Sequence, residues 1–288
     1  MVLRDKERLT VSIYPRFKGT IIMELKLLNS TQEILNLITD LTGKSFEFIH
    51  KPDLPTLAMV KIARENMPLH LIYYKNISPG NIDHLIAHEC GHIYRMMSVP
   101  SEYRKVPASN MENRQIAMTK IENELFKLSK DIPIEKMSSL FELWFNGIIK
   151  QLTNYPVDMR IEQWIYDNYP ELRKAQRITV DKQIRENVQA LSEKIKKISP
   201  AFIYDTSNTM NYAFASFMES LIEKKYTTPY KRTEYPEVGA KLVKFLIKTK
   251  DEGYKQDIEI INKWSNLLGL SEWFYWTDFE NVPLDYLD

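Results

Sequence analysis

Apolar residues recur at helical spacing through most of the chain beyond residue 100. One stretch shows this well, with steps of four and three residues along a single helix face: Val180, Ile184, Val188, Leu191, Ile195 and Ile198. The same spacing predicts further helices over 112–130, 134–152, 207–224, 236–250 and 255–268. Only eight of the 288 residues are glycines, which favours few tight hairpins and much helix.

The first third of the chain combines amphipathic helices with short β-prone runs. Ser30 and Glu33 match a capping box, and Gly43 supplies a stop, which together predict a helix over 31–42. Three runs predict the strands of a small sheet: 46–48, 57–63 and 69–74. Helical spacing then returns over 81–97.

The expected fold class is α+β, mainly α. Asn154 precedes Pro156, and this order predicts that a new helix starts there. We expect an N-terminal α+β part over 1–100 and a helical part over 101–288, unless the two form one integrated domain.

Composition excludes several classes of protein. The 39 basic and 38 acidic side chains nearly balance, so nucleic acid is not an expected partner. The single cysteine, Cys90, rules out an intramolecular disulfide or a thiolate zinc cluster and favours the cytoplasm. Charges of both signs in Met1–Arg8 leave no room for an apolar export signal, and no run of about 18 apolar residues predicts a membrane span.

Three of the five histidines lie within nine residues of one another, on the helix predicted over 81–97. Among them, His88, Glu89 and His92 form the pattern H-E-x-x-H. Residues four apart on a helix differ by roughly 40° in direction and about 6 Å in rise, so two imidazoles can converge on one metal ion. The adjacent Glu89 can then take a proton from a metal-activated water, which is the chemistry of amide hydrolysis.

With this motif the chain resembles the zincin metallopeptidases, in which H-E-x-x-H lies on an active-site helix preceded by the edge strand of a small sheet. The resemblance covers the helix over 81–97 and extends to the strand over 69–74. It implies one Zn²⁺ ion, with His88 and His92 as ligands and Glu89 as general base. The metzincin extension is absent because no histidine follows His92. The resemblance therefore implies a carboxylate as third ligand, as in the gluzincin and aspzincin branches.

Asp158 and Glu162 are the best carboxylate candidates. They are four apart on a predicted helix and share a face, where like charges normally repel each other. In gluzincins a ligand glutamate is followed four residues later by a carboxylate that orients a ligand histidine. By position Asp158 would bind the metal and Glu162 would orient the histidine, although the reverse assignment stays open. Asp158 could instead complement a helix N-terminus, and Glu162 could be a surface charge.

Other residues are alternatives or have weaker claims. Four other acidic residues on predicted helices could supply the ligand: Glu122, Glu124, Glu142 and Glu219. Tyr212 is a candidate for stabilising the oxyanion of the reaction, although core or surface packing is the favoured interpretation of this residue. We expect His84 to be a partly exposed helix residue and Cys90 to be an apolar filler. Gly91, inside a helix at a cost of roughly 1 kcal/mol relative to alanine, indicates close approach of a substrate or strand.

The expected function is a zinc-dependent peptidase, a hydrolase that acts on a peptide or protein substrate. The alternative is a catalytically silent or regulatory zincin-fold protein that binds a specific protein partner. Activity on generic peptides would favour the first, and a stable complex without cleavage would favour the second.

Overall fold

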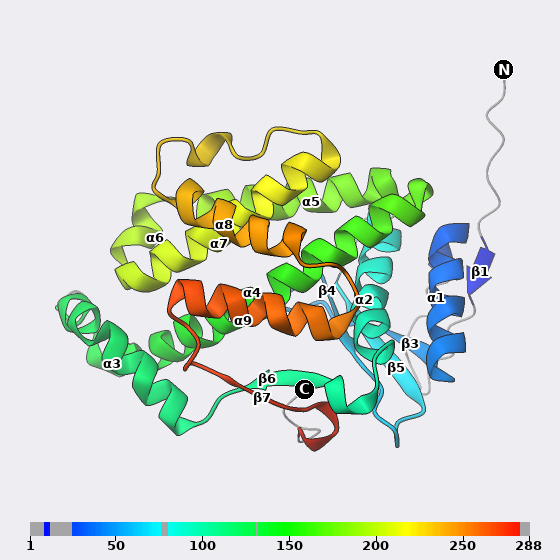
Figure 1. Ribbon diagram of the computed structural model, residues 1–288, viewed down its shortest axis with the longest axis horizontal. Coiled ribbons are helices and arrows are strands. Elements are labelled where there is room, and N and C mark those ends of the chain that lie inside the picture. The colour runs from blue at the N-terminus through cyan, green and yellow to red at the C-terminus, as the bar shows by residue number, and fades with distance from the viewer. Residues whose placement is uncertain (1–8, 12–24, 76–79, 131, 283–288) are drawn as a thin grey trace. The chain divides into compact units, whose positions relative to one another are not determined.

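The computed structural model describes residues 9–11, 25–75, 80–130 and 132–282 (Figure 1). The fold is α+β and mainly α. Contacts divide the chain into two units. The first unit comprises Met1–Ser101, Ile161–Thr179 and Val282–Asp288, and the second comprises Glu102–Arg160 and Val180–Asn281.

A three-stranded sheet lies in the first unit, with β5 (Leu69–Tyr74) in the centre. β5 pairs in parallel with β3 (Ser45–His50) and antiparallel with β4 (Ala58–Lys61). The three predicted strands are confirmed, but the strand before the H-E-x-x-H helix is not the edge strand that the zincin pattern predicts. The hairpin between β4 and β5 puts β4 at one edge, and parallel pairing with β3 covers the other side of β5. Another antiparallel pair joins β1 (Leu9–Val11) to β2 (Leu25–Leu27).

Helices α1 (Asn29–Thr42) and α2 (Ile82–Met97) pack together in this unit. Gly43 ends α1 in the left-handed conformation, as predicted, with φ of 66°. The predicted capping box is wrong, because α1 starts at Asn29 and Ser30 lies within its first turn. The start of α1 is instead held by Asp83 of α2, whose Oδ1 accepts hydrogen bonds from Leu28 N at 2.7 Å and Thr31 Oγ1 at 2.8 Å.

Helix α4 (Ile134–Asn168) runs without a break through Pro156. The helix start predicted at Asn154 is therefore wrong. A proline inside a helix removes one backbone hydrogen bond and costs about 3 kcal/mol, but apolar neighbours on α4, such as Leu152 and Met159, are fully buried. Packing thus offsets the local cost, and Asp158 and Glu162 lie on one continuous helix.

The long helix predicted through Ile198 is interrupted. α5 (Arg173–Gln189) ends before Ser192, whose extended backbone precedes the short α6 (Glu193–Lys197). Helix α7 (Ala201–Ile222) starts more than one turn before the range predicted for it. The other helices lie close to their predicted ranges: α3 (Met111–Leu128), α8 (Tyr235–Lys248) and α9 (Tyr254–Leu268). Four short 3-10 segments complete the helical elements of the described residues: Ser101–Tyr103, Pro170–Leu172, Thr228–Tyr230 and Phe279–Asn281.

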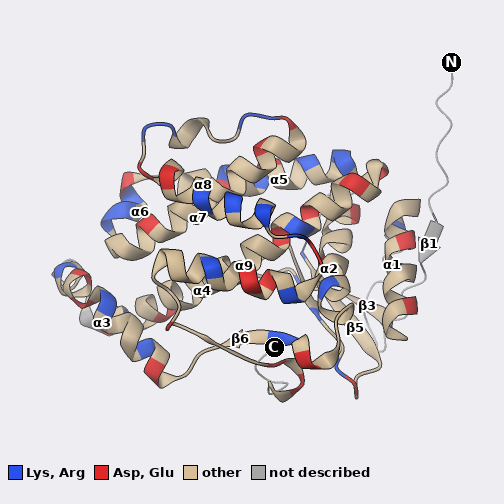
Figure 2. Cartoon of the chain, viewed as in Figure 1, with Lys and Arg blue, Asp and Glu red and all other residues tan. Residues whose placement is uncertain are grey.

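In the second unit α8 packs against both α7 and α9 (Figure 1). Trp264 of α9 is fully buried and donates a hydrogen bond to the carbonyl of Leu242 in α8. An antiparallel pair that the sequence patterns did not predict joins β6 (Lys105–Ala108) to β7 (Tyr275–Asp278). Both acidic and basic residues occur along α3 and α9 (Figure 2). Across the ranges that the structure describes, no helix has the length and hydropathy needed to cross a bilayer.

Candidate functional site

Helix α2 carries three histidines in a row along one side. The side chain of His84 is 1% exposed, that of His88 is 18% exposed, and His92 is partly buried. The ring centroids of His84 and His88 are 6.1 Å apart, and those of His88 and His92 are 5.1 Å apart. The expectation that His84 is partly exposed is therefore wrong.

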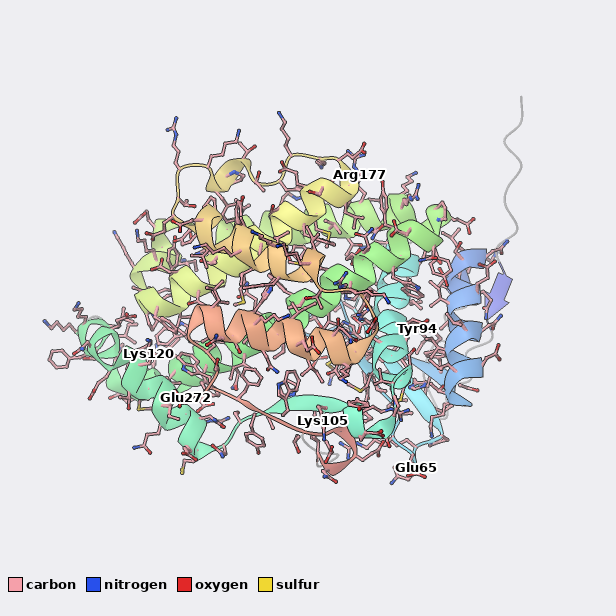
Figure 3. The ribbon with its side chains drawn as sticks, in the orientation of Figure 1. Glu65, Tyr94, Lys105, Lys120, Arg177 and Glu272 are labelled. Atoms are coloured by element: carbon pink, nitrogen blue, oxygen red, sulfur yellow. The ribbon has the colours of Figure 1, made fainter. Side chains whose placement is uncertain are left out.

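The C-terminal part of α4 packs closely on α2 at Gly91. A Cβ atom added to Gly91 would lie 2.5 Å from Cγ2 of Ile161, and Ile161 is fully buried. The close approach that this glycine predicts is therefore made by a helix and not by a strand. One turn farther along, the ring of Tyr94, labelled in Figure 3, stacks on Trp164 with centroids 5.4 Å apart and planes 7° apart. These contacts place Glu162 beside the histidine row.

The two carboxylate oxygens of Glu162 contact different histidines. Oε1 lies 2.9 Å from Nδ1 of His88, and Oε2 lies 3.0 Å from Nε2 of His84. Glu162 is 3% exposed, so the notion of a surface charge is wrong. One metal-binding atom from each of these three residues lies within 4.8 Å of the other two. Two tetrahedral zinc ligands are separated by about 3.3 Å, so the shorter observed contacts are those of hydrogen bonds.

Gln176 of α5 completes the surroundings of Glu162. Its Nε2 donates to Oε2 of Glu162 at 2.6 Å and to the backbone carbonyl of the same residue at 2.8 Å. Burial by itself would raise the pKa of Glu162, but the charges and hydrogen bonds of His84 and His88 hold this pKa well below its usual range. The carboxylate is therefore ionised at neutral pH.

The ionised Glu162 defines the chemistry available to His88. Because Nδ1 lies beside an ionised carboxylate, which can only accept a hydrogen bond, this nitrogen is the donor, and in a neutral imidazole Nε2 is then the nitrogen that can bind a metal. This arrangement is typical of metal-binding histidines, whose second ring nitrogen usually donates to a carboxylate or carbonyl. The role of Glu162 in orienting a metal-bound His88 stays a prediction.

Glu89 and Cys90, inside the motif, are both buried. Glu89 is 9% exposed and Cys90 is fully buried. Burial, followed by the negative charge of Glu89, raises the pKa of the Cys90 thiol well above its usual value. The thiol is therefore neutral, in agreement with the apolar filler that we expected.

Asp158 lies on α4 one turn before Glu162 and shares its helix face, and its side chain is partly buried. Three of the four alternative acidic residues are engaged within the second unit. Glu142 pairs with Arg114 at 3.1 Å, Glu219 accepts from the backbone N–H groups of Tyr226 and Thr227, and Glu124 accepts from that of Phe202. The fourth, Glu122, is exposed. Asp158 therefore stays the best candidate for the third ligand.

Tyr212 lies on α7 in the second unit. Its ring packs against Gly239 of α8, where an added Cβ would overlap the tyrosine ring, and edge-on against Tyr230 with centroids 5.7 Å apart. These contacts describe a packing environment, and the oxyanion role stays a prediction.

Sequence reasoning missed two polar residues of the first unit. Gln176 carries no motif, and only its position on the helix after Glu162 could have drawn attention to it. His70, which lies outside the H-E-x-x-H motif, is fully buried in β5. Its Nδ1 accepts from the N–H of Ala63 at 3.0 Å, and its Nε2 lies 3.1 Å from Oγ1 of Thr42.

Comparisons with protein-family models, with curated proteins and with solved structures give no match for this chain.

Proposed function

We propose that the chain is a zinc-dependent peptidase that resembles the zincins, with a single Zn²⁺ held by His88, His92 and Asp158. The observation that carries this proposal is the 2.9 Å contact between Nδ1 of His88 and the ionised, buried Glu162. Burying a carboxylate costs much free energy unless it is paired and hydrogen-bonded. His84, His88 and Gln176 supply those partners to Glu162, and one of them is the imidazole proposed to bind the metal.

The proposed ligands form a chemically suitable set. His88, His92 and Asp158 make up one of the groups of described residues that could hold a metal ion. Two imidazoles and one carboxylate are a common protein ligand set for catalytic zinc, which keeps a further position open. Asp158 also lies one turn before Glu162 on α4, so this helix would supply both the third ligand and the carboxylate that orients the first.

Glu89 is the proposed general base. When bound, zinc supplies a Lewis acid that polarises the scissile carbonyl and makes water acidic enough to ionise near neutral pH. Glu89 follows His88 directly on α2, so its carboxylate can accept a proton from the attacking water and pass it to the leaving amine. Because Glu89 is 9% exposed, little bulk water competes for that proton.

Exchange of Glu89 for glutamine tests this function. Glu89→Gln keeps the size of the side chain but removes the base, so one equivalent of zinc should stay bound while peptide hydrolysis falls by 10²-fold or more, a loss on the order of that expected for a general base. Glu33→Gln on α1, an exposed site, is the matched control and should retain full activity. Zinc is measured by atomic absorption after dialysis, and hydrolysis with a library of quenched fluorescent peptides.

Two outcomes would contradict the proposal. Full hydrolysis by the Glu89→Gln variant would refute the mechanism, and less than one equivalent of zinc in the unaltered protein would refute the metal site.

As a peptidase with one buried thiol and no disulfide, the protein would act in the reducing cytoplasm on a peptide or protein substrate.

A further inference from the structure

We propose that His84 and Gln176 are positioning residues that hold Glu162 in the geometry that orients His88 toward the metal. This inference rests on the proposed zinc site and extends it by two residues that take no part in the motif. Both lie in the first unit, on α2 and α5 respectively.

The contacts of Glu162 divide between its two oxygens. Oε1 accepts a hydrogen bond from His88. Oε2 accepts hydrogen bonds from Nε2 of His84 at 3.0 Å and from Nε2 of Gln176 at 2.6 Å. A glutamate has three side-chain torsions, so one contact to His88 would leave the carboxylate plane free to turn. Two donors on the opposite oxygen remove that freedom.

Gln176 binds both the side-chain carboxylate and the backbone carbonyl of Glu162. Its amide nitrogen bonds the carbonyl oxygen of Glu162 at 2.8 Å as well as Oε2, so the side chain is held relative to the axis of α4. Gln176 is fully buried, and its own Oε1 has no hydrogen-bond partner among the described residues. The amide is therefore oriented to favour Glu162 at the expense of its other polar atom.

His84 likewise directs one polar atom to Glu162 and leaves the other without a partner among the described residues. The side chain is 1% exposed, and its Nδ1 is buried without a hydrogen-bond partner in the described part of the chain. All the hydrogen bonding of this ring is thus directed through Nε2 to Glu162. If core stability alone were served, apolar side chains would fill these two positions without unpaired polar atoms.

Zinc affinity separates a positioning role from a structural one. His84→Leu and Gln176→Leu each remove a donor to Oε2 and fill similar space, so each should weaken zinc binding by about 10- to 100-fold, the range typical of residues that support metal ligands. His84→Gln places an amide nitrogen near the original Nε2 and should restore affinity close to that of the unaltered chain. Ile38→Ala, in the fully buried core of α1, should lower the melting temperature without changing the zinc dissociation constant.

The measurement uses the full chain and zinc itself. The dissociation constant is obtained by competition with a chromophoric chelator, thermal unfolding is followed in parallel, and Co²⁺ replaces Zn²⁺ for visible spectra that report ligand geometry. We expect altered Co²⁺ spectra for both leucine variants and a normal spectrum for His84→Gln.

The outcomes distinguish this inference from the proposed function. Unchanged zinc affinity and Co²⁺ spectra in both leucine variants, while the unaltered chain binds zinc tightly, would overturn the positioning role and leave the zinc site intact. Loss of affinity in His84→Gln equal to that in His84→Leu would also overturn it. If the unaltered chain binds no zinc, the proposed function fails and this inference fails with it.

Discussion

Gly91→Ala tests how tightly α4 packs on the H-E-x-x-H helix. In an unconstrained helix, alanine in place of glycine stabilises by about 1 kcal/mol. Here the new Cβ would lie 2.5 Å from Cγ2, 3.0 Å from Cγ1 and 3.2 Å from Cβ of Ile161. The nearest contact is too short by more than 1 Å for two carbon atoms.

Ile161 cannot easily move away from the added methyl group. It is fully buried, and a β-branched side chain in a helix has one strongly preferred rotamer. Overpacking of this kind typically costs 1–3 kcal/mol and occasionally more. With a clash at three atoms, we place the cost near the upper end, and the helix-propensity gain leaves a net destabilisation of about 1–2 kcal/mol.

The assay measures the free energy of unfolding in urea for Gly91→Ala and for a control variant in which a glycine of another helix is replaced by alanine. Gly147 lies inside α4, is exposed, and has nothing within 4 Å of an added Cβ. Gly147→Ala should therefore raise the free energy of unfolding, by up to about 1 kcal/mol. In a double-mutant cycle, Ile161→Ala should relieve much of the cost of Gly91→Ala. A Gly91→Ala protein that gains as much stability as Gly147→Ala would refute the close approach of the two helices.

Two further predictions concern the first unit. Asp83→Ala removes the carboxylate that accepts hydrogen bonds from Leu28 N and Thr31 Oγ1 at the start of α1. We expect the free energy of unfolding, measured by denaturant titration, to fall by about 1–2 kcal/mol. An unchanged midpoint would contradict the capping role of Asp83. Burial, with a smaller effect of Lys44, lowers the pKa of His70 to about 4. Between pH 4 and pH 6.5 the unfolded chain therefore binds more protons than the folded chain. The contribution of His70 to the free energy of unfolding is complete above pH 6.5 and is lost as the pH falls from 6.5 to 4, at up to about 1.4 kcal/mol per pH unit. Unfolding titrations at pH 7 and pH 5 measure this loss, and a His70→Asn variant that keeps the full difference would assign it elsewhere.

Local patterns predicted helices well where the chain carries its own end signals. Gly43 and Gly269 both adopt positive φ and end α1 and α9, because glycine enters the left-handed region without a steric cost. The same reasoning failed at Asn154. The local pattern there is typical of a helix start, but the apolar side chains around it are buried, and their packing keeps α4 helical through this position. A cap or a proline acts within one turn, whereas burial depends on distant elements.

The sequence by itself determined the helical character of the chain and the row of histidines, because both follow from spacing along one helix. It also singled out Asp158 and Glu162 as a pair on one face. Only the tertiary structure decided that Glu162 faces His84 and His88, that Gln176 holds it, and that Gly91 makes room for Ile161. Those contacts join residues 14 to 78 positions apart, and such pairs are chosen by the packing of whole helices, which no local pattern encodes.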